Sequence, residues 1–579
     1  RKIDAKGFMN ISSSLMLETG MPEIGLKYGM IFDYKNNNYF DLKLETAKIA
    51  EFEIAYKSNL AMVKNPKLTA HFQGVPKKAK GNIVFNLKNT SIKNQKDNIV
   101  FTDLKLTSNI VAGLNKKESK ISSKFILDTN NIKLHSGLVD SSFPNANISG
   151  ECFLDKSNSP LCSMTLKASS GKAEASKFKT KALGIDIEVP VSYPEPVKKQ
   201  YGKYSISSIL YDKKYNFSTK GKILQTNSKE FNINGDINLK QLPGIKTRFD
   251  SIIGFEKDLG MSVEFQTNSF KLSESDIKKL TFTKIPASEF EVTLFAKGSA
   301  EYIDHNLKSR MLLTVNDGKF FMLDNNLTAE GINSVIEFND LLSLETVPGQ
   351  VLTINSIEKD KIKIDDARVR FSMEQGKSLL VENIKFKWCN GIVSTEAIRF
   401  PQKNSEYSLT LYCDRLELTQ LLKQMGAFNA EGMGTMNGRI PVVFSNGNIS
   451  FDNGFLFSTP GKGGKIMIEN SDRITTGIPM DSPQFSQLDL AQEALKDFNY
   501  KWAKLKFHTQ EDTLFVDMEL DGEPSKILPF EYSKESGGFV RVDASSPGSH
   551  FQGIKLDVNL KLPFNEVIKS GNKLKSIFN

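Results

Sequence analysis

The chain is poor in the residues on which most catalytic and metal sites depend. Among its 579 residues there are only five histidines and four cysteines. No two histidines lie at metal-ligand spacing, none lies near a Gly-rich elbow, and no CxxC or mixed Cys/His pattern has zinc spacing. The histidines are His71, His135, His305, His508 and His550. We therefore expect no catalytic residue, no metal and no cofactor, and we predict that the protein is not an enzyme.

Two kinds of segment could suggest catalysis, and neither is strong evidence for it. The run 460–465 has the glycines of a phosphate loop, but Thr459 stands where the first glycine is required and neither Ser nor Thr follows Lys465. The acid pairs Asp365-Asp366 and Glu511-Asp512 fall at expected strand edges and turns, where solvation explains them. A glycosidase stays open at this stage, because its two carboxylates need not be close in the sequence.

Long apolar runs and basic clusters are also absent. No stretch of eighteen apolar residues occurs, and the chain opens with Arg1 rather than Met, so we expect a soluble segment whose membrane anchor would lie upstream. The net charge is +9, but the 76 Lys and Arg residues are scattered singly or in pairs along the chain and form no long run. Nucleic-acid binding would require a basic stripe or a recognisable module, so we expect no nucleic-acid partner.

What the chain has in abundance is two-residue alternation of apolar and polar side chains. From Phe231 to Leu239 every odd position is apolar or Gly and every even position is polar, and the same pattern returns from Phe40 to Leu562. There are forty Phe residues against two Trp. Phe adds a large hydrocarbon surface without a polar atom, which suits contact with acyl chains, although Phe filling the cores of β-sandwiches explains it as well.

The strands that these patterns predict are joined by short turns. Turn signals such as Asn446-Gly447, Asn453-Gly454 and Asp521-Gly522 lie between them, and short turns join antiparallel neighbours. No low-complexity linker is present; Pro190, Pro194 and Pro196 mark the nearest thing to a hinge, because proline interrupts strand pairing. We predict a mainly β protein, a long, twisted antiparallel sheet folded lengthwise into a U-shaped, taco-like groove.

Apolar stripes at helical spacing predict a few short helices in the C-terminal third. They are expected near 416–425, 487–498 and 564–578, with Gly426 capping the first. Each would plug or flank a sheet end; the last, with its lysines, would alternatively lie on a membrane surface. We expect an elongated β groove over 1–360 and a C-terminal β domain with these helices over 361–579.

The apolar face of the strands is the expected lipid-binding site. Its predicted members alternate with polar residues and should all face the groove. They are Phe231, Ile233, Ile237, Leu239, Ile362, Ile364, Leu409, Leu411, Ile449, Phe451, Val516, Met518, Ile554, Leu556, Val558 and Leu560.

The four cysteines fall in two pairs with hairpin spacing. Cys152 and Cys162 flank a turn segment, and Cys389 and Cys413 lie in what we expect to be consecutive strands. Cross-strand neighbours can come within disulfide reach, so two bridges could form in an oxidising compartment. Four buried thiols are the alternative, and the sequence does not choose between them.

Six segments in chain order resemble the YdbH family of AsmA-like intermembrane phospholipid transport proteins. A short-helix segment at 416–422 is followed by two spaced glycines and an Ile-Pro pair at 434–442. A glycine-turn strand at 449–456 and a Pro-Gly at 459–461 come next, then segments 493–500 and 518–522. One departure is Glu523, where the family pattern leads us to expect Asn before the proline. Over 1–360 the chain resembles the family only in its succession of alternating strands.

The resemblance implies a function, a location and partners. Such proteins look like inner-membrane-anchored bridges in the periplasm of Gram-negative bacteria, whose apolar groove carries phospholipids to the outer membrane. The implied partners are phospholipid acyl chains, the inner membrane through an N-terminal anchor, and an outer-membrane partner that would add a strand at the C-terminal end. A dicarboxylate-transport label is attached to this C-terminal domain, but no spanning pore is expected here to support it.

Two other classes of protein remain open from the sequence. A β-sandwich scaffold or adhesin of the cell envelope would use the same strands but seal their apolar faces in dry cores. A polysaccharide enzyme on a β-helix would show a regular repeat of about 20 to 25 residues per coil, and no such repeat is found.

Overall fold

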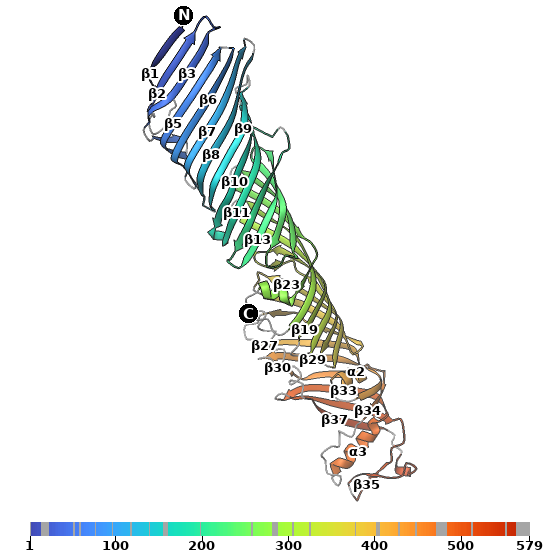
Figure 1. Ribbon diagram of the computed structural model, residues 1–579. Coiled ribbons are helices and arrows are strands. Elements are labelled where there is room, and N and C mark those ends of the chain that lie inside the picture. Colours follow the sequence, from blue (N-terminus) through green and yellow to red (C-terminus); the bar gives the residue numbers. More distant parts are fainter. Residues whose placement is uncertain are drawn as a thin grey trace. The chain divides into compact units, whose positions relative to one another are not determined.

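Figure 1 shows the computed structural model of the protein. The structure describes residues 2–562 except 13–22, 50–51, 57–58, 76, 95–96, 116–117, 138, 155–159, 197, 256–258, 281–287, 304–305, 323–325, 360, 377, 401–405, 426–428, 446–447, 470–482, 511–512, 536 and 550–552. The chain divides into two compact units. Unit 1 comprises 1–268 and 298–308, and unit 2 comprises 269–297 and 309–579.

Unit 1 is an antiparallel meander in which nearly every strand pairs with the next one along the chain. β3 and β4 are the exception, because both pair with different parts of β5. The strands are β1 (Lys2–Ser12), β2 (Glu23–Asp33), β3 (Tyr39–Ile49), β4 (Phe52–Tyr56), β5 (Asn59–Val75), β6 (Lys78–Lys93), β7 (Asn98–Asn115), β8 (Glu118–His135), β9 (Asp140–Leu154), β10 (Pro160–Ala175), β11 (Thr180–Tyr193), β12 (Tyr201–Tyr211), β13 (Tyr215–Asn227), β14 (Glu230–Leu239), β15 (Lys246–Phe255) and β16 (Leu259–Thr267). In Figure 1 the strands from β5 to β9 lie side by side in this order.

Unit 2 is also built from antiparallel strands, with three α-helices among the residues described. Its first elements are β17 (Phe270–Ser273), α1 (Glu274–Leu280), β18 (Ser288–Ile303), β19 (Asn306–Met322), β20 (Leu327–Asp340), β21 (Glu345–Thr346), β22 (Gln350–Lys359), β23 (Ile362–Glu374), β24 (Ser378–Trp388), β25 (Gly391–Thr395), β26 (Ile398–Phe400) and β27 (Glu406–Glu417). They are followed by α2 (Leu418–Gln424), β28 (Asn429–Met433), β29 (Thr435–Ser445), β30 (Asn448–Phe451), β31 (Gly454–Ser458), β32 (Gly464–Glu469), α3 (Pro483–Leu495), β33 (Phe498–Gln510), β34 (Thr513–Pro524), β35 (Phe530–Ser533), β36 (Gly538–Arg541) and β37 (Ile554–Leu562). β18 and β19 each lie on both sides of the division between the units.

The mainly β, antiparallel prediction is confirmed, and two of the expected helices are present with different bounds: the first is shorter, and the second, Pro483–Leu495, starts and ends earlier. The first helix starts at Leu418, because Leu416 still belongs to β27, and the second ends at Leu495, because Phe498 begins β33. The third expected helix, 564–578, and the cap at Gly426 lie outside the described residues. The sequence did not predict α1, which is only seven residues long.

The expectation that Pro190 interrupts strand pairing is wrong on the β10 side of β11 and confirmed on the β12 side, where pairing ends at Glu188. Pro190 lies inside β11, opposite Thr165 of β10. Proline is tolerated there because β11 pairs with β12 only from Thr180 to Glu188, so its backbone nitrogen is not needed for the ladder on that side.

Alternation decides which side chains are buried. Along β34 odd positions are half-buried and even positions buried, from Thr513 to Leu520, as a strand with one covered face requires. One register row of this buried face, in which each residue is the cross-strand partner of the next, runs through Met518. The row is Phe386, Val393, Cys413, Gly438, Leu456, Leu505, Met518 and Val558.

Two helices close this core in unit 2. Leu418, Leu421 and Leu422 of α2 are at most 1% exposed, and Leu490, Ala494 and Leu495 of α3 are at most 5% exposed. All six side chains belong to the same hydrophobic cluster as the register row. Strands with one apolar face therefore form a sealed core in this part of the chain.

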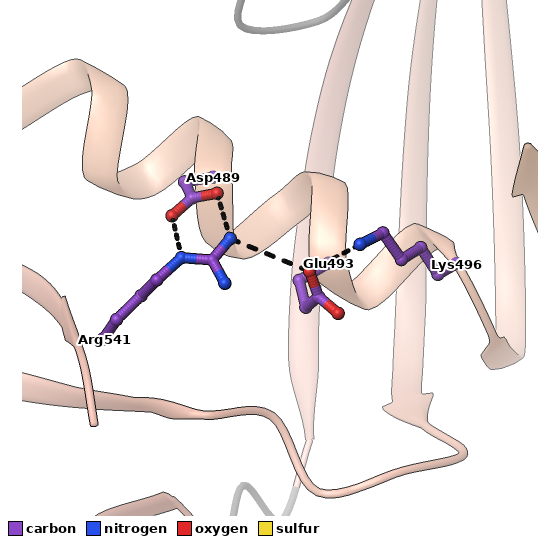
Figure 2. A network of polar contacts seen from close by, with 4 residues as sticks. All are labelled: Asp489, Glu493, Lys496 and Arg541. Atoms are coloured by element: carbon purple, nitrogen blue, oxygen red, sulfur yellow. Dashed lines mark hydrogen bonds and ion pairs between the residues drawn. The ribbon is translucent and has the colours of Figure 1, made fainter. Parts of the chain in front are cut away.

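An arginine clamp holds α3 against the hairpin of β35 and β36 (Figure 2). The Arg541 side chain donates from Nε and Nη2 to the two oxygens of Asp489, at 2.8 and 2.6 Å. Its Nη2 also lies 3.8 Å from Glu493, which pairs with Lys496 at 2.8 Å. The guanidinium stacks over the ring of the buried Phe530, 5.1 Å from its centroid. Because a bidentate pair fixes orientation as well as distance, the clamp orients the helix over the core.

Three β-bulges recur with the same construction. In β10, β19 and β27 two residues face a single residue of the neighbouring strand. The second bulged residue has positive φ, and its backbone N–H donates to the side chain of the single opposite residue at 2.9 Å. The donor and acceptor pairs are Ser170 with Asp186, Asp317 with Asn333, and Arg415 with Asn437. A bulge bends and twists its strand, and the Asp or Asn opposite satisfies the N–H that the ladder leaves unpaired.

Replacement of one bulge acceptor should loosen its two strands. Asn333→Ala removes the bond from the Asp317 N–H and the bond donated to the Gly331 carbonyl. Losing such bonds to half-buried backbone costs about 1–3 kcal/mol, so amide exchange in β19 and β20 should quicken roughly 5- to 150-fold. Asn306→Ala, at the exposed start of β19, is the control and should leave exchange unchanged. Equal exchange in both variants would show that the acceptor does not hold the bulge.

Candidate lipid-binding face

The apolar side chains of unit 1 align into rows that cross many strands. In one row each residue is the register partner of the next, from β5 to β11. Its members are Leu68, Phe85, Leu106, Leu127, Ile148, Leu166 and Val189. Only Val189, at 7% exposed, is buried; the other six are half-buried. The row is thus a partly accessible hydrocarbon strip rather than a sealed core.

The neighbouring row on the same face continues the strip to β16. It contains smaller side chains as well as aromatic rings, and Tyr204 lies beside the glycines of the two strands that follow. The row is Leu87, Leu104, Thr129, Ala146, Ala168, Ile187, Tyr204, Gly221, Gly235, Phe249 and Phe265.

The predicted lipid-contacting residues of β14 lie on this face. Ile233 and Ile237 flank Gly235 of the second row and share its side of the strand, as do Phe231 and Leu239. All four side chains are half-buried. The structure therefore brings these four together with the rows that begin at Leu68 and Leu87.

The opposite face of the same strands is polar and salt-bridged. Its register row reads Lys105, Asp128, Asn147, Lys167, Glu188, Lys203, Lys222, Asn234 and Asp250. Glu188 accepts from Lys167 and Lys203 at 3.0 and 3.1 Å, and hydrogen bonds from these two lysines lower the pKa of its carboxyl. One face of the sheet is thus hydrocarbon and the other is charged.

A hollow of about 1330 Å³ lies over the polar face, not the apolar one. Its lining comes from three successive rows: the polar rows that contain Lys167 and Ser169, and the row between them that contains Ala168. Because the outer two rows are the polar ones, their side chains form the walls and the backbone of the middle row forms the floor. The hollow is therefore walled by polar side chains.

Two predicted residues lie early in unit 2. Ile362 and Ile364 of β23 are half-buried, and Ile364 is the register partner of Ile357 in β22 and of Trp388 in β24. Their exposure resembles that of the strip in unit 1.

The predicted residues nearest the C-terminus lie in the closed core. Val516, Met518, Leu556 and Val558 are 0 to 5% exposed and belong to the hydrophobic cluster closed by α2 and α3. Leu411, Phe451 and Ile554 pack against that cluster. Leu409 is half-buried opposite Val442. Ile449 and Leu560 belong to β30 and β37, but their side chains lie outside the described residues.

One cysteine pair is bonded and the other is not. Cys152 and Cys162 form a disulfide between directly opposite positions of β9 and β10, with Cα atoms 4.1 Å apart. Cys389 and Cys413 are free and buried. Burial raises the pKa of each of these two thiols to about 12.

The residues that the structure describes contain no group of three or more His, Cys, Asp or Glu side chains arranged to hold a metal ion. Among the same residues, no helix combines the length and the apolar character needed to cross a membrane.

The glycines of the C-terminal motif have steric roles. A Cβ on Gly434 would lie 1.8 Å from the Tyr500 hydroxyl, and one on Gly438 would lie 2.2 Å from the Phe455 carbonyl oxygen. Both have φ above +130°, which L side chains rarely adopt. Tyr500 is 2% exposed, and burial raises its pKa to about 12. These glycines let β29 and the residue before it approach their neighbours closely.

Comparison with known proteins identifies one part of the chain. Residues 312–522 match the family model described as YdbH-like, intermembrane phospholipid transport protein YdbH. Residues 312–522 are a YdbH-like domain. The match confirms the resemblance drawn from the short-helix and glycine motifs, and the family is one of transport proteins rather than enzymes. Intermembrane transport implies the cell envelope. No curated protein and no solved structure matches the chain.

The thiol assignments predict how the cysteines react with iodoacetamide. At about pH 8 the raised pKa values keep Cys389 and Cys413 protonated, and burial blocks access, so the folded protein should take up no label. Unfolding without a reductant should expose two reactive thiols, and unfolding with a reductant should expose four. Mass spectrometry counts the labels. Four labels without a reductant would contradict the disulfide, and labels on the folded protein would contradict the burial.

Proposed function

We propose that the protein carries phospholipids between the inner and outer membrane of a Gram-negative envelope, with their acyl chains held against the apolar face of its sheet. The transfer would supply lipid to the outer membrane, and a periplasmic location with an inner-membrane anchor belongs to the same proposal. The observation that carries it is the pair of register rows through Leu127 and Ile187, which give a half-buried hydrocarbon strip across unit 1. The YdbH-like domain supports the same conclusion.

The energetics favour such a strip. An acyl chain that crosses water exposes its methylenes at about 0.8 kcal/mol each, so a continuous hydrocarbon surface removes most of the barrier. The path needs no specific ligand residue, because tails are recognised by apolar area alone. Headgroups stay in water, since the strip offers them few partners.

The path that we propose follows Phe231, Ile233, Ile237 and Leu239 and includes Ile362 and Ile364. A lengthwise fold of the sheet into a groove would shield the tails on this face from water, and the three bulges are sites where strands could bend. The closed core around Met518 is left out of the path, because its side chains have no surface free for a tail.

A scaffold with sealed β cores is the second candidate, and one observation favours it. The cluster closed by α2 and α3 is the dry core that a scaffold requires. Lipid transfer and scaffolding therefore make different predictions for unit 1, where the apolar side chains are partly exposed.

Photocrosslinking in cells should separate the two candidates. A photoreactive amino acid at Ile237 should label phospholipid, because this side chain lies on the apolar face, whereas one at Asn238 on the opposite face should not. Met518, fully buried in the closed core, provides a second negative site. Lipid mass spectrometry of the conjugates measures the outcome. Equal labelling at Ile237 and Asn238, or none at either, would rule out transport along this face.

A charge placed in the strip should slow transfer. Leu127→Lys introduces an ammonium group into a half-buried hydrocarbon row, while Asp128→Lys introduces the same group on the polar face one residue away. An ammonium group in hydrocarbon costs about 2.5–3.5 kcal/mol, and the flexible lysine side chain recovers part of this cost by bringing the group to water. We therefore expect roughly tenfold slower transfer for Leu127→Lys and unchanged transfer for Asp128→Lys. Transfer of a fluorescent phospholipid between donor and acceptor vesicles gives the rate. Unchanged transfer in a folded Leu127→Lys protein would argue against the proposed path.

A further inference from the structure

Hydroxyl groups lie buried among the hydrocarbon of the strip in unit 1. Thr219 of β13 is the register partner of Ile237. Ser251 of β15 is the register partner of Ile233. Thr129 of β8 lies on the same face, in the second of the two rows. These three side chains are only 5 to 8% exposed. Polar groups buried in this way are normally hydrogen-bonded, so each of them calls for a partner.

Two of these hydroxyls have no partner in the part of the chain that the structure describes. Neither Thr129 Oγ1 nor Ser251 Oγ makes a hydrogen bond with any described residue. Buried serines of unit 2 differ, since Ser334 and Ser549 donate to backbone carbonyl oxygens at 2.9 and 3.0 Å. An unpaired hydroxyl in hydrocarbon costs free energy that a bound acceptor would recover.

Thr219 has a partner, but the bond leaves one proton unused. Its hydroxyl oxygen lies 3.3 Å from that of Tyr204, and either oxygen could be the donor. Each hydroxyl carries one proton, and only one of the two protons can lie between them. The pair makes no other hydrogen bond to the described residues, so one of its protons lacks an acceptor there.

Tyr204 presents this pair to the strip. Its side chain is half-buried, and a Cβ on Gly235 would lie 2.4 Å from its hydroxyl oxygen. The phenol therefore reaches from β12 across β13 to β14, over backbone that carries no side chain. Burial raises the pKa of Tyr204 above its usual value, so the phenol keeps its proton at neutral pH.

The hydroxyls recur along the direction in which a lipid would travel. Thr129 on β8 lies four strands from Tyr204 on β12, and Ser251 on β15 lies three strands further. At roughly 4.8 Å per strand these steps are about 19 and 14 Å. Ile233 and Val263, which flank Ser251 in its register row, are half-buried, so rotation of their side chains opens its hydroxyl to the strip.

We propose that these hydroxyls donate to the ester carbonyl oxygens of phospholipids, so that the strip binds acyl esters and not hydrocarbon alone. An ester carbonyl accepts hydrogen bonds and cannot donate one, which matches side chains that hold protons without acceptors. The esters join the tails to the headgroup, so they leave water when the tails are drawn onto the strip, and pairing then satisfies donor and acceptor together. The inference rests on the proposed function and names the part of the lipid that polar side chains of the strip bind.

Competition between ester and ether lipids tests the inference. The full chain is incubated with vesicles that hold equal amounts of a diacyl phosphatidylethanolamine and of its dialkyl ether analogue, whose tails match in length but lack the carbonyl oxygens. After the vesicles are removed by flotation, mass spectrometry counts the two lipids on the protein. We expect about fivefold more of the diacyl lipid, which corresponds to one hydrogen bond of about 1 kcal/mol.

A quadruple variant without the hydroxyls should lose this preference. It combines Thr129→Val, Tyr204→Phe, Thr219→Val and Ser251→Ala. These changes nearly keep the side-chain shapes, so the ratio of the two lipids should fall close to one, while the temperature of thermal unfolding should not fall. Ser169→Ala with Ser205→Ala removes hydroxyls from the polar face instead and should keep the fivefold preference.

The outcomes separate the inference from the proposed function. Equal uptake of the two lipids by the unaltered protein would overturn the inference and leave the proposed transport intact, since lipid would still be bound. A preference that persists in the quadruple variant, or one that is lost in the polar-face variant, would also overturn it. A lower unfolding temperature in the quadruple variant would show that the hydroxyls are bonded within the fold, with the same consequence. Uptake of neither lipid would contradict the proposed function, and the inference with it.

Discussion

Cross-strand register is the constraint on which the rest of this molecule depends. Side chains alternate between the two faces of a strand, so a slip of one residue would move every apolar side chain to the polar face. In unit 1 the register holds Leu127 and Ile148 in one row and Asp128 and Asn147 in the next. The same rule in unit 2 stacks Leu505, Met518 and Val558 into its core. Both the strip and the core are consequences of pairing, not of any single strand.

The two units use the same apolar face differently because different elements lie over it. In unit 2, α2 and α3 contribute six buried side chains to the core cluster, and the Arg541 clamp orients α3. In unit 1 most side chains of the corresponding rows stay half-buried. Short helices therefore decide whether the apolar face of alternating strands is sealed in a dry core or stays an accessible hydrocarbon surface.

The sequence predicted the strands well, because alternation over eight or more residues is a local signal. It also predicted α2 and α3, and their apolar stripes meet the core. It could not predict the rows, since these depend on which residue of one strand faces which residue of the next. The bulges were missed because Ser170, Asp317 and Arg415 are not glycines, and their Asp or Asn acceptors lie on other strands. The cysteines make the same point: Cys162 faces Cys152 directly, whereas Cys413 faces Val393.

The bulges explain how the strand register stays fixed across so many strands. Each bulge inserts one residue into a strand, which would shift every later row unless the following strands start from the new alignment. The single Asp or Asn opposite each bulge fixes the point of insertion, because only there does its side chain meet the unpaired N–H. Bulge position is thus specified by one polar contact, while the rows on either side are specified by hydrocarbon burial. A continuous apolar face needs both, since apolar contacts alone would tolerate a register displaced by two residues, which the polar contact at the bulge excludes.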